Sequence, residues 1–350
     1  MSFHLDTATL GPLLVAQLPT TARLLAVDAT SLAPDGSYNA DLWRVALTWQ
    51  PADSPLPAQL IAKLPSRNAA LLDHAAVFQP GARENWFYTH AAQATPIATP
   101  RCYYHAIDAA SGQSILLLQD LGPTAHAATF DLTLTEAQAA LGTAARLHAA
   151  WWEAQTHPAI ERLRQLLEPT LPDEQNFVGA LFDAAWSRFK ARFAAVLTPA
   201  AAALGDALVG HMPLVDQLLE ARHATLVHGD FRRANLAFAN QQCWVFDWED
   251  LFFGNGLLDV SWLLGSGLPP ALVPQEVSLV RAYHAQLVAH GVSAYPWTHC
   301  WEDYRRTMFN LFVQGVLSAV HEAADRADLA GRVCAAAARL DLLALLDTDP

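Results

Sequence analysis

The chain has 350 residues, of which 53% are apolar and only 16% are charged, so it can bury a large core. Its formal net charge of −13 argues against a nucleic-acid-binding protein, because such proteins need a basic face. Four scattered cysteines fit a reducing compartment, and no apolar run approaches the roughly 18 residues of a membrane span. We therefore expect a cytoplasmic protein that does not cross a membrane.

The first part of the chain predicts a short helix followed by a β-sheet. Residues 6–18 have the pattern of an amphipathic helix that begins at Asp6 or Thr7. Apolar and β-branched residues then predict strands at residues 23–29, 42–49 and 59–64. A turn-rich segment, residues 34–39, connects the first two of these strands.

Two charged residues of this region stand in apolar surroundings. Lys63 is the single charge of its predicted strand, and a helix over residues 82–94 would place Glu84 on its apolar face. A lysine within an apolar strand needs an edge position or a partner, and an unpaired buried carboxylate is costly. A buried ion pair between Lys63 and Glu84 would satisfy both residues, and we favour it over two unrelated charges.

A buried strand and a break in the chain separate this region from a helical remainder. Residues 115–119 read as the strand, and Gly122-Pro123 marks the break. A long helix with a Thr-x-x-Gln capping pattern is predicted at residues 135–152. Further helices are predicted at residues 177–197, 201–220, 257–264, 274–290, 301–320 and 329–346.

The segment LVHGDFRRANLAFANQQCWVFDWED, residues 226–250, carries the strongest functional pattern. Two short apolar runs flank the polar residues 240–242, which predicts a β-hairpin. If the turn centres on Gln241, Asn235 lies opposite Asp247, at a Cα separation of roughly 4.5–5.5 Å. An amide oxygen and a carboxylate at that spacing can share a hard cation such as Mg²⁺. Asp230 lies in the loop that enters the same end of the hairpin.

An acid, an asparagine and a second acid in this order form the layout of protein-kinase-type phosphoryl transfer. His-Gly-Asp at residues 228–230 stands where protein kinases have His-Arg-Asp, and Asp-Trp-Glu at residues 247–249 stands where they have Asp-Phe-Gly. No Ala-Pro-Glu motif follows. The pattern resembles the aminoglycoside phosphotransferase and choline kinase-like superfamily of small-molecule kinases. The runs RENWFY at residues 83–88 and LLLQDL at residues 116–121 resemble its ecdysteroid-kinase-like branch. The resemblance extends from about residue 30 to residue 265.

The resemblance implies roles for the acidic segment. Asp230 would orient the hydroxyl of the acceptor and take its proton, while Asn235 and Asp247 would hold Mg²⁺ against the nucleotide phosphates. Arg232 would steady the transferred phosphoryl group. His228 and Asp259 would be structural and support the catalytic loop.

The resemblance also implies a nucleotide site in the N-terminal part. Lys63, paired with Glu84, would contact the phosphates of ATP. The segment that contains Ser37 would cover these phosphates, although a plain hairpin turn is an equally good interpretation of its sequence. The backbone of Gln119 and Leu121 would face the adenine.

The resemblance implies an α+β, bilobal protein-kinase-like fold, with an antiparallel β-rich N-lobe at residues 1–121 and a mostly helical C-lobe at residues 122–350. The expected activity is transfer of the γ-phosphoryl group from ATP, with Mg²⁺, to a hydroxyl of a small molecule. An antibiotic, a sterol-like or other alcohol, a hydroxy acid and an amino alcohol all stay open as acceptors, as does GTP as donor. The alternative is a catalytically silent nucleotide-binding module.

Overall fold

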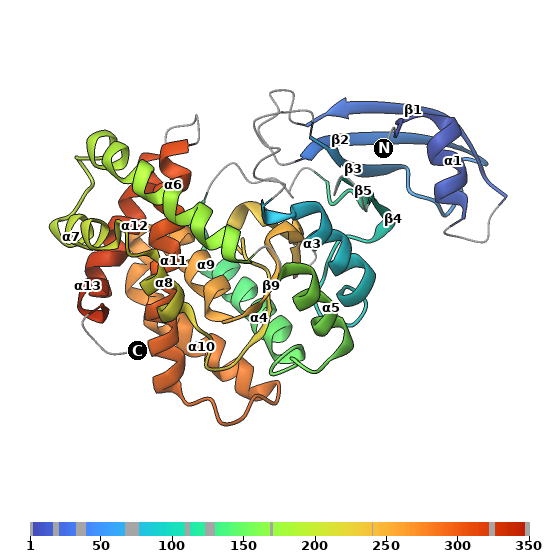
Figure 1. The fold of residues 1–350 in the computed structure, drawn as a ribbon. Helices are drawn as coiled ribbons and strands as arrows, with labels where there is room; N and C mark the ends of the chain where they lie inside the picture. The colour runs from blue at the N-terminus through green and yellow to red at the C-terminus, as the bar shows by residue number, and fades with distance from the viewer. Residues whose placement is uncertain are drawn as a thin grey trace. The chain divides into compact units, whose positions relative to one another are not determined.

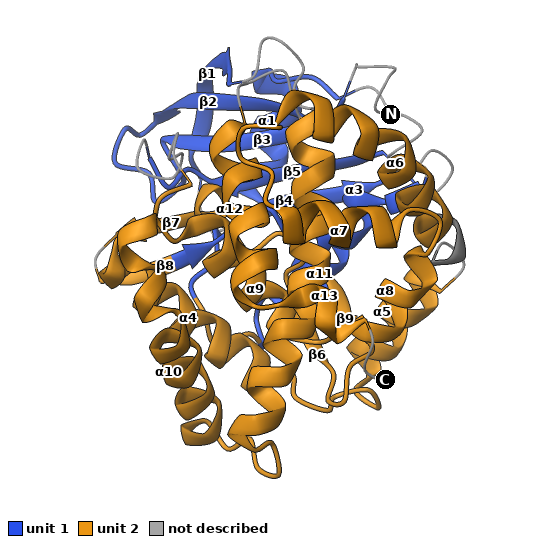
Figure 2. Ribbon diagram, turned by 90° about the vertical axis from the view of Figure 1, so that its left-hand side faces the viewer, with its two compact units in different colours: residues 1–94, 98–125, 244–250 blue, residues 95–97, 126–243, 251–350 orange. Residues whose placement is uncertain are grey.

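The computed structural model describes residues 3–16, 21–32, 40–66, 77–108, 113–122, 130–168, 171–239, 241–321 and 326–346 (Figure 1). The chain divides into two compact units (Figure 2). Unit 1 comprises residues 1–94, 98–125 and 244–250, and unit 2 comprises residues 95–97, 126–243 and 251–350. The boundary that we predicted between residues 121 and 122 stays a prediction. No helix of the described residues is long and apolar enough to span a membrane.

Unit 1 is built on a five-stranded antiparallel sheet with strand order β1-β2-β3-β5-β4. Its strands are β1 (Arg23–Ser31), β2 (Ala40–Gln50), β3 (Gln59–Pro65), β4 (Cys102–Ile107) and β5 (Ser114–Gln119). β3 is an interior strand, where Lys63 pairs with Leu42 on one side and Leu116 on the other. Edge protection is therefore not the reason for Lys63.

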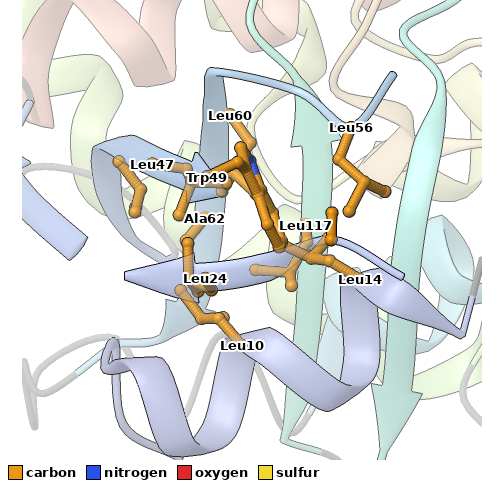
Figure 3. Close-up of a cluster of buried hydrophobic side chains, with 11 residues drawn as sticks. Leu10, Leu14, Leu24, Leu47, Trp49, Leu56, Leu60, Ala62 and Leu117 are labelled. Atoms are coloured by element: carbon orange, nitrogen blue, oxygen red, sulfur yellow. The ribbon is translucent and has the colours of Figure 1, made fainter. Parts of the chain in front are cut away.

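One face of this sheet is covered by α1 (Thr7–Val15), which Asp6 caps by accepting a hydrogen bond from the amide of Thr9 at 2.8 Å. Leu10 and Leu14 of α1 are fully buried in a cluster with side chains of the sheet (Figure 3). Each buried leucine contributes roughly 1.5–3 kcal/mol relative to an exposed one, so this cluster holds the helix on the sheet.

A helix with two geometries follows in unit 1. α3 (Pro80–Trp86) continues into the π-helical turn η2 (Phe87–Ala91), in which the amide of Ala92 donates to the carbonyl of Phe87 at 2.9 Å. The sequence predicted one α-helix over residues 82–94, and the π-turn was not foreseen. Such turns widen a helix by one residue and occur often at functional sites.

Unit 2 is mostly helical (Figure 1). Its larger helices are α4 (Leu134–Ala150), α5 (Pro158–Leu167), α6 (Leu171–Arg192), α7 (Pro199–Leu208), α8 (Met212–Leu219), α9 (Leu257–Gly267), α10 (Glu276–Ala289), α11 (Trp297–His321) and α12 (Ala327–Arg339), with the short α13 (Leu342–Leu345) at the end. Strands β6 (Thr225–Val227) and β9 (Phe252–Gly254) pair in an antiparallel manner. The predicted α+β class, with an antiparallel sheet in the N-terminal part and a helical remainder, is confirmed.

Several predicted helix boundaries are wrong for identifiable reasons. The capping box of α4 is formed by Thr133 and Glu136, so the N-cap residue, Thr133, lies two residues before the predicted start at residue 135. The helix predicted at residues 201–220 is two helices, because Gly210 adopts φ 74° between α7 and α8. The helix predicted at residues 329–346 is interrupted after α12, where Asp341 has φ 50°. Among the strands and α-helices, β4, β6, β9 and α5 were not predicted.

The predicted hairpin is present as β7 (Leu236–Ala239) and β8 (Gln242–Val245). Gln242, which we predicted to belong to the turn, is the first residue of β8. Gln241 has φ 61°, and residue 240 lies outside the described residues. In unit 1, the amide of Val245 donates to the carbonyl of Ala98 at 2.9 Å, which holds the end of β8 and the following residues 246–250 to that unit.

Candidate active site

In unit 1, three carboxylates converge on the ammonium group of Lys63. Its Nζ lies 2.7 Å from Oε2 of Glu84 and 2.6 Å from both Oδ1 of Asp247 and Oε2 of Glu249. The predicted Lys63–Glu84 ion pair is therefore present, on β3 and α3. The two further carboxylates come from the segment after β8, which η5 (Trp248–Asp250) shapes into a tight turn. Glu249 was not singled out from the sequence.

Burial and charge oppose each other at this cluster. Burial lowers the pKa of Lys63, but the surrounding carboxylates outweigh it and hold that pKa well above its usual value. Burial, reinforced by the charge of Asp247, raises the pKa of Glu249 to about 8. Burial also raises the pKa of Glu84, against the pull of Lys63. One ammonium therefore does not keep all three carboxylates ionised at neutral pH.

The same carboxylates fit a divalent cation. Glu84, Asp247 and Glu249 each offer an oxygen, and these oxygens lie within 4.8 Å of one another. Carboxylate oxygens are the ligands that Mg²⁺ prefers, and a bound divalent cation would favour the ionised forms of Glu84 and Glu249. Asp247 is the most accessible of the three, with 34% of its side chain exposed.

Aromatic packing fixes the segment that carries Asp247 and Glu249. The fully buried indole of Trp248 stacks on the ring of Phe87, with centroids 3.7 Å apart and planes inclined by 7°. Phe87 is the first residue of the π-turn η2, three residues after Glu84. This contact couples the placement of Glu84 to that of its acidic neighbours on Lys63.

The candidate hinge of unit 1 begins at the end of β5. The amide of Gln119 donates to the carbonyl of Arg101 at 2.8 Å, so a hydrogen bond from the Gln119 backbone to a base would involve its carbonyl. The carboxylate of Asp120 accepts from Nε of Arg44 at 2.7 Å and from the amide of Gly122 at 2.8 Å. Gly122 adopts φ 82°, which favours glycine. Leu121 lies within this braced turn, and Ser37 lies outside the described residues.

In unit 2, a buried carboxylate supports the loop that carries Asp230. This loop follows β6, and Gly229 within it has φ 88°. Asp259 on α9 is fully buried and accepts the amides of His228 and Gly229, each at 2.9 Å. Nε2 of His148, on α4, lies 3.1 Å from Asp259. A buried carboxylate that receives two backbone donors fixes the loop conformation.

His228 and His148 are parts of this support. Nδ1 of His228 accepts the amide of Asp230 at 3.3 Å, and the ring is buried. Nδ1 of His148 lies 2.7 Å from the hydroxyl of Tyr283 on α10. Both imidazoles therefore have structural partners within unit 2.

The carboxylate of Asp230 receives three side-chain donors. Trp262 Nε1 donates to Oδ1 at 2.6 Å, Asn235 Nδ2 donates to Oδ2 at 2.7 Å, and Arg232 Nε lies 2.9 Å from each of the two oxygens. Asn235 Nδ2 also donates to the carbonyl of Asp230 at 2.9 Å, which leaves its own amide oxygen as the group available to a cation. Arg232, predicted to contact a phosphoryl group, is here paired with Asp230. Trp262 was not predicted.

Asn235 and Asp247 belong to different compact units. Their apposition, which we derived from the hairpin, stays a prediction, and its derivation counted Gln242 in the turn, whereas Gln242 belongs to β8. Within the described residues, Lys63, Glu84 and Asp247 come together in unit 1, and Asp230, Arg232 and Asn235 come together in unit 2.

Comparison with known proteins decides the family. Residues 36–293 match the ecdysteroid kinase-like family. This chain belongs to that family. No curated protein matches the sequence. The membership agrees with the superfamily that the sequence predicted.

Solved structures share the fold of this ecdysteroid kinase-like chain. A choline kinase from Cryptosporidium parvum Iowa II is 9% identical, with 92% of this chain and 90% of the other covered and a TM-score of 0.57. A Plasmodium vivax ethanolamine kinase is 12% identical, with 89% and 82% covered and a TM-score of 0.50. At such low identity the likeness concerns the fold alone, and it confirms the predicted kinase-like fold.

Proposed function

We propose that this ecdysteroid kinase-like protein is an ATP- and Mg²⁺-dependent phosphotransferase that acts on a hydroxyl of a small molecule. The observation that carries the proposal is the convergence of Glu84 and Asp247 on Lys63 in unit 1. A buried lysine held by a helical glutamate, next to an acid that can bind a metal, is the arrangement that phosphoryl transfer requires.

The residues of unit 1 would bind the nucleotide. Lys63 would neutralise charge on the phosphates, and the backbone carbonyl of Gln119 with the amide of Leu121 would face the base. Asp247 and Glu249, together with Asn235 of unit 2, would hold Mg²⁺. When bound, Mg²⁺ would neutralise the charge that develops on the phosphates. The segment that contains Ser37 would cover the phosphates.

Asp230 would act on the acceptor. Its carboxylate would accept a hydrogen bond from the acceptor hydroxyl and take the proton. The hydroxyl oxygen would bond to the γ-phosphorus as the bond from that phosphorus to the β–γ bridging oxygen breaks, and ADP would leave. Arg232, next to Asp230, would add positive charge where the phosphoryl group passes. Catalysis would come mainly from positioning and charge neutralisation.

Two structural neighbours, a choline kinase and an ethanolamine kinase, are named for small-molecule acceptors, which agrees with a small-molecule acceptor here. An antibiotic, a sterol-like or other alcohol, a hydroxy acid and an amino alcohol are the classes to screen. A cytoplasmic location is part of the same proposal, and GTP stays open as an alternative donor.

Nucleotide affinity tests the metal role. Isothermal titration of ATP with and without Mg²⁺ should show Mg²⁺-dependent binding by the wild-type protein, and Asp247→Ala should abolish that dependence. Asp206→Ala is the matched control, because Asp206 also pairs with a lysine, Lys190, but at an exposed site of unit 2. Unchanged Mg²⁺-dependent binding by Asp247→Ala would contradict the assignment.

A screen for product separates an enzyme from a silent module. The protein would be incubated with ATP, Mg²⁺ and hydroxylated compounds of each class, and phosphorylated product would be detected by mass spectrometry. A phosphomonoester of one class supports the enzyme. Tight Mg²⁺-ATP binding without product from any class would favour the nucleotide-binding module.

A further inference from the structure

The indole of Trp262 makes a short hydrogen bond to the candidate base. Trp262 Nε1 donates to Asp230 Oδ1 at 2.6 Å, and the Trp262 side chain is almost completely buried. Every residue of α9 is buried, and the hydroxyl of Ser266 donates to the Trp262 carbonyl at 2.6 Å. The donor is therefore mounted on a rigid element, not on a mobile loop.

The donors on Asp230 reach its two oxygens from different elements. Trp262 approaches Oδ1 from α9, and Asn235 approaches Oδ2 from the 3₁₀ turn η4 (Arg233–Asn235). Arg232 is close to both oxygens. Rotation of the carboxylate about its Cβ–Cγ bond would break the bonds from Trp262 and Asn235 together, so this pair sets the plane of the carboxylate.

Trp262 differs from Arg232 and Asn235, the other two donors to Asp230, because no second role is proposed for it. Arg232 and Asn235 carry other proposed duties toward the phosphoryl group and the metal. The side chain of Trp262 has one polar atom, Nε1, and this atom donates to Asp230. A phenylalanine at this position would fill most of the same volume but would remove the donor that α9 supplies to Oδ1, leaving Arg232 beside that oxygen.

We propose that Trp262 is a positioning residue that locks the carboxylate of Asp230 in the orientation needed to receive the hydroxyl proton of the acceptor. The inference deepens the proposed function and rests on it. A misplacement of a reacting group by about 1 Å can cost about 10²-fold in rate, which gives the scale of the effect expected for Trp262→Phe.

The chain provides a matched control in the same unit. Trp186 on α6 is equally buried, and its Nε1 donates to Oδ1 of Asp206 at 2.7 Å. Trp186→Phe therefore removes the same kind of bond, from an indole to an aspartate, at a place with no proposed part in turnover. Comparison of the two variants separates loss of packing from loss of positioning.

Steady-state kinetics gives the first readout. With an acceptor in hand, Trp262→Phe should lower kcat by about tenfold to 10²-fold while KM for ATP changes less than about twofold, and Trp186→Phe should leave both unchanged. Equal kcat values for Trp262→Phe and the wild type, or equal losses in the two variants, would overturn the positioning role.

A spectroscopic readout is independent of activity. In ¹H–¹⁵N spectra of the full chain, the signal missing in Trp262→Phe identifies the indole N–H of Trp262. Asp230→Asn should move that signal upfield, because an amide is a weaker acceptor than a carboxylate. No response would overturn the inference. A response in a protein that phosphorylates no acceptor would instead show that the contact exists and that the proposed function, with the role of Trp262 in it, is wrong.

Discussion

Replacement of Lys63 by methionine tests the cluster of unit 1 most severely, because it removes the one cation and leaves three carboxylates. Lys63 is 12% exposed and lies within 2.7 Å of all three. Breaking a buried ion pair from one side costs about 3–5 kcal/mol, since the other charge stays buried. The oxygens that the three carboxylates offer lie within 4.8 Å of one another, so two ionised carboxylates there would repel by at least roughly 3 kcal/mol at an effective dielectric constant near 20.

We therefore expect Lys63→Met to lower the free energy of unfolding by about 3–5 kcal/mol at neutral pH. Urea denaturation followed by circular dichroism, in buffer with a chelator, measures it. Lys190→Met is the control, because Lys190 forms a 2.7 Å ion pair with Asp206 while 39% exposed. Such a pair contributes at most about 1 kcal/mol. A loss of stability in Lys63→Met no larger than that of the control would refute the electrostatic reasoning.

Two further predictions concern stability. Glu249 has a folded-state pKa of about 8 where an unfolded glutamate has about 4.5, so the folded chain holds the extra proton between these values. In metal-free buffer the free energy of unfolding should fall as pH rises from 5 to 8, and Glu249→Gln should flatten this slope; identical slopes would contradict the assignment. Asp259→Ala removes the acceptor of the backbone amides of His228 and Gly229, and each unsatisfied amide costs about 1–3 kcal/mol. Asp259→Ala should therefore lower the thermal midpoint of unfolding far more than Asp259→Asn, which keeps one acceptor oxygen.

Features that depend on a local sequence pattern, such as the Lys63–Glu84 pair and the β7–β8 hairpin, could be predicted. Lys63 was recognised because it interrupts an apolar strand, and Glu84 because helical periodicity placed it on an apolar face. Burial forces such charges to find partners, so the pair followed from sequence. The hairpin of β7 and β8 followed from two apolar runs around a polar turn.

Contacts between residues far apart in the sequence could not be predicted in this way. Glu249 belongs to the Asp-Trp-Glu run in which only Asp247 was assigned a role, and the fold brings its carboxylate to Lys63. Trp262 lies in a helix that is buried all round, so periodicity cannot mark one side as functional. The first residue of the π-turn η2, Phe87, stacks on Trp248, a contact between distant segments that sequence alone does not reveal.

The most direct test of the proposed chemistry is transfer of label from [γ-³²P]ATP to the acceptor by wild-type protein and Asp230→Asn. The account predicts that kcat falls by about 10²–10⁴-fold in Asp230→Asn, the range that a general base contributes, while ATP affinity is unchanged. Asp206→Asn, which alters an aspartate that is likewise bonded to an indole and a cation, should match the wild type. Wild-type turnover by Asp230→Asn would contradict the account.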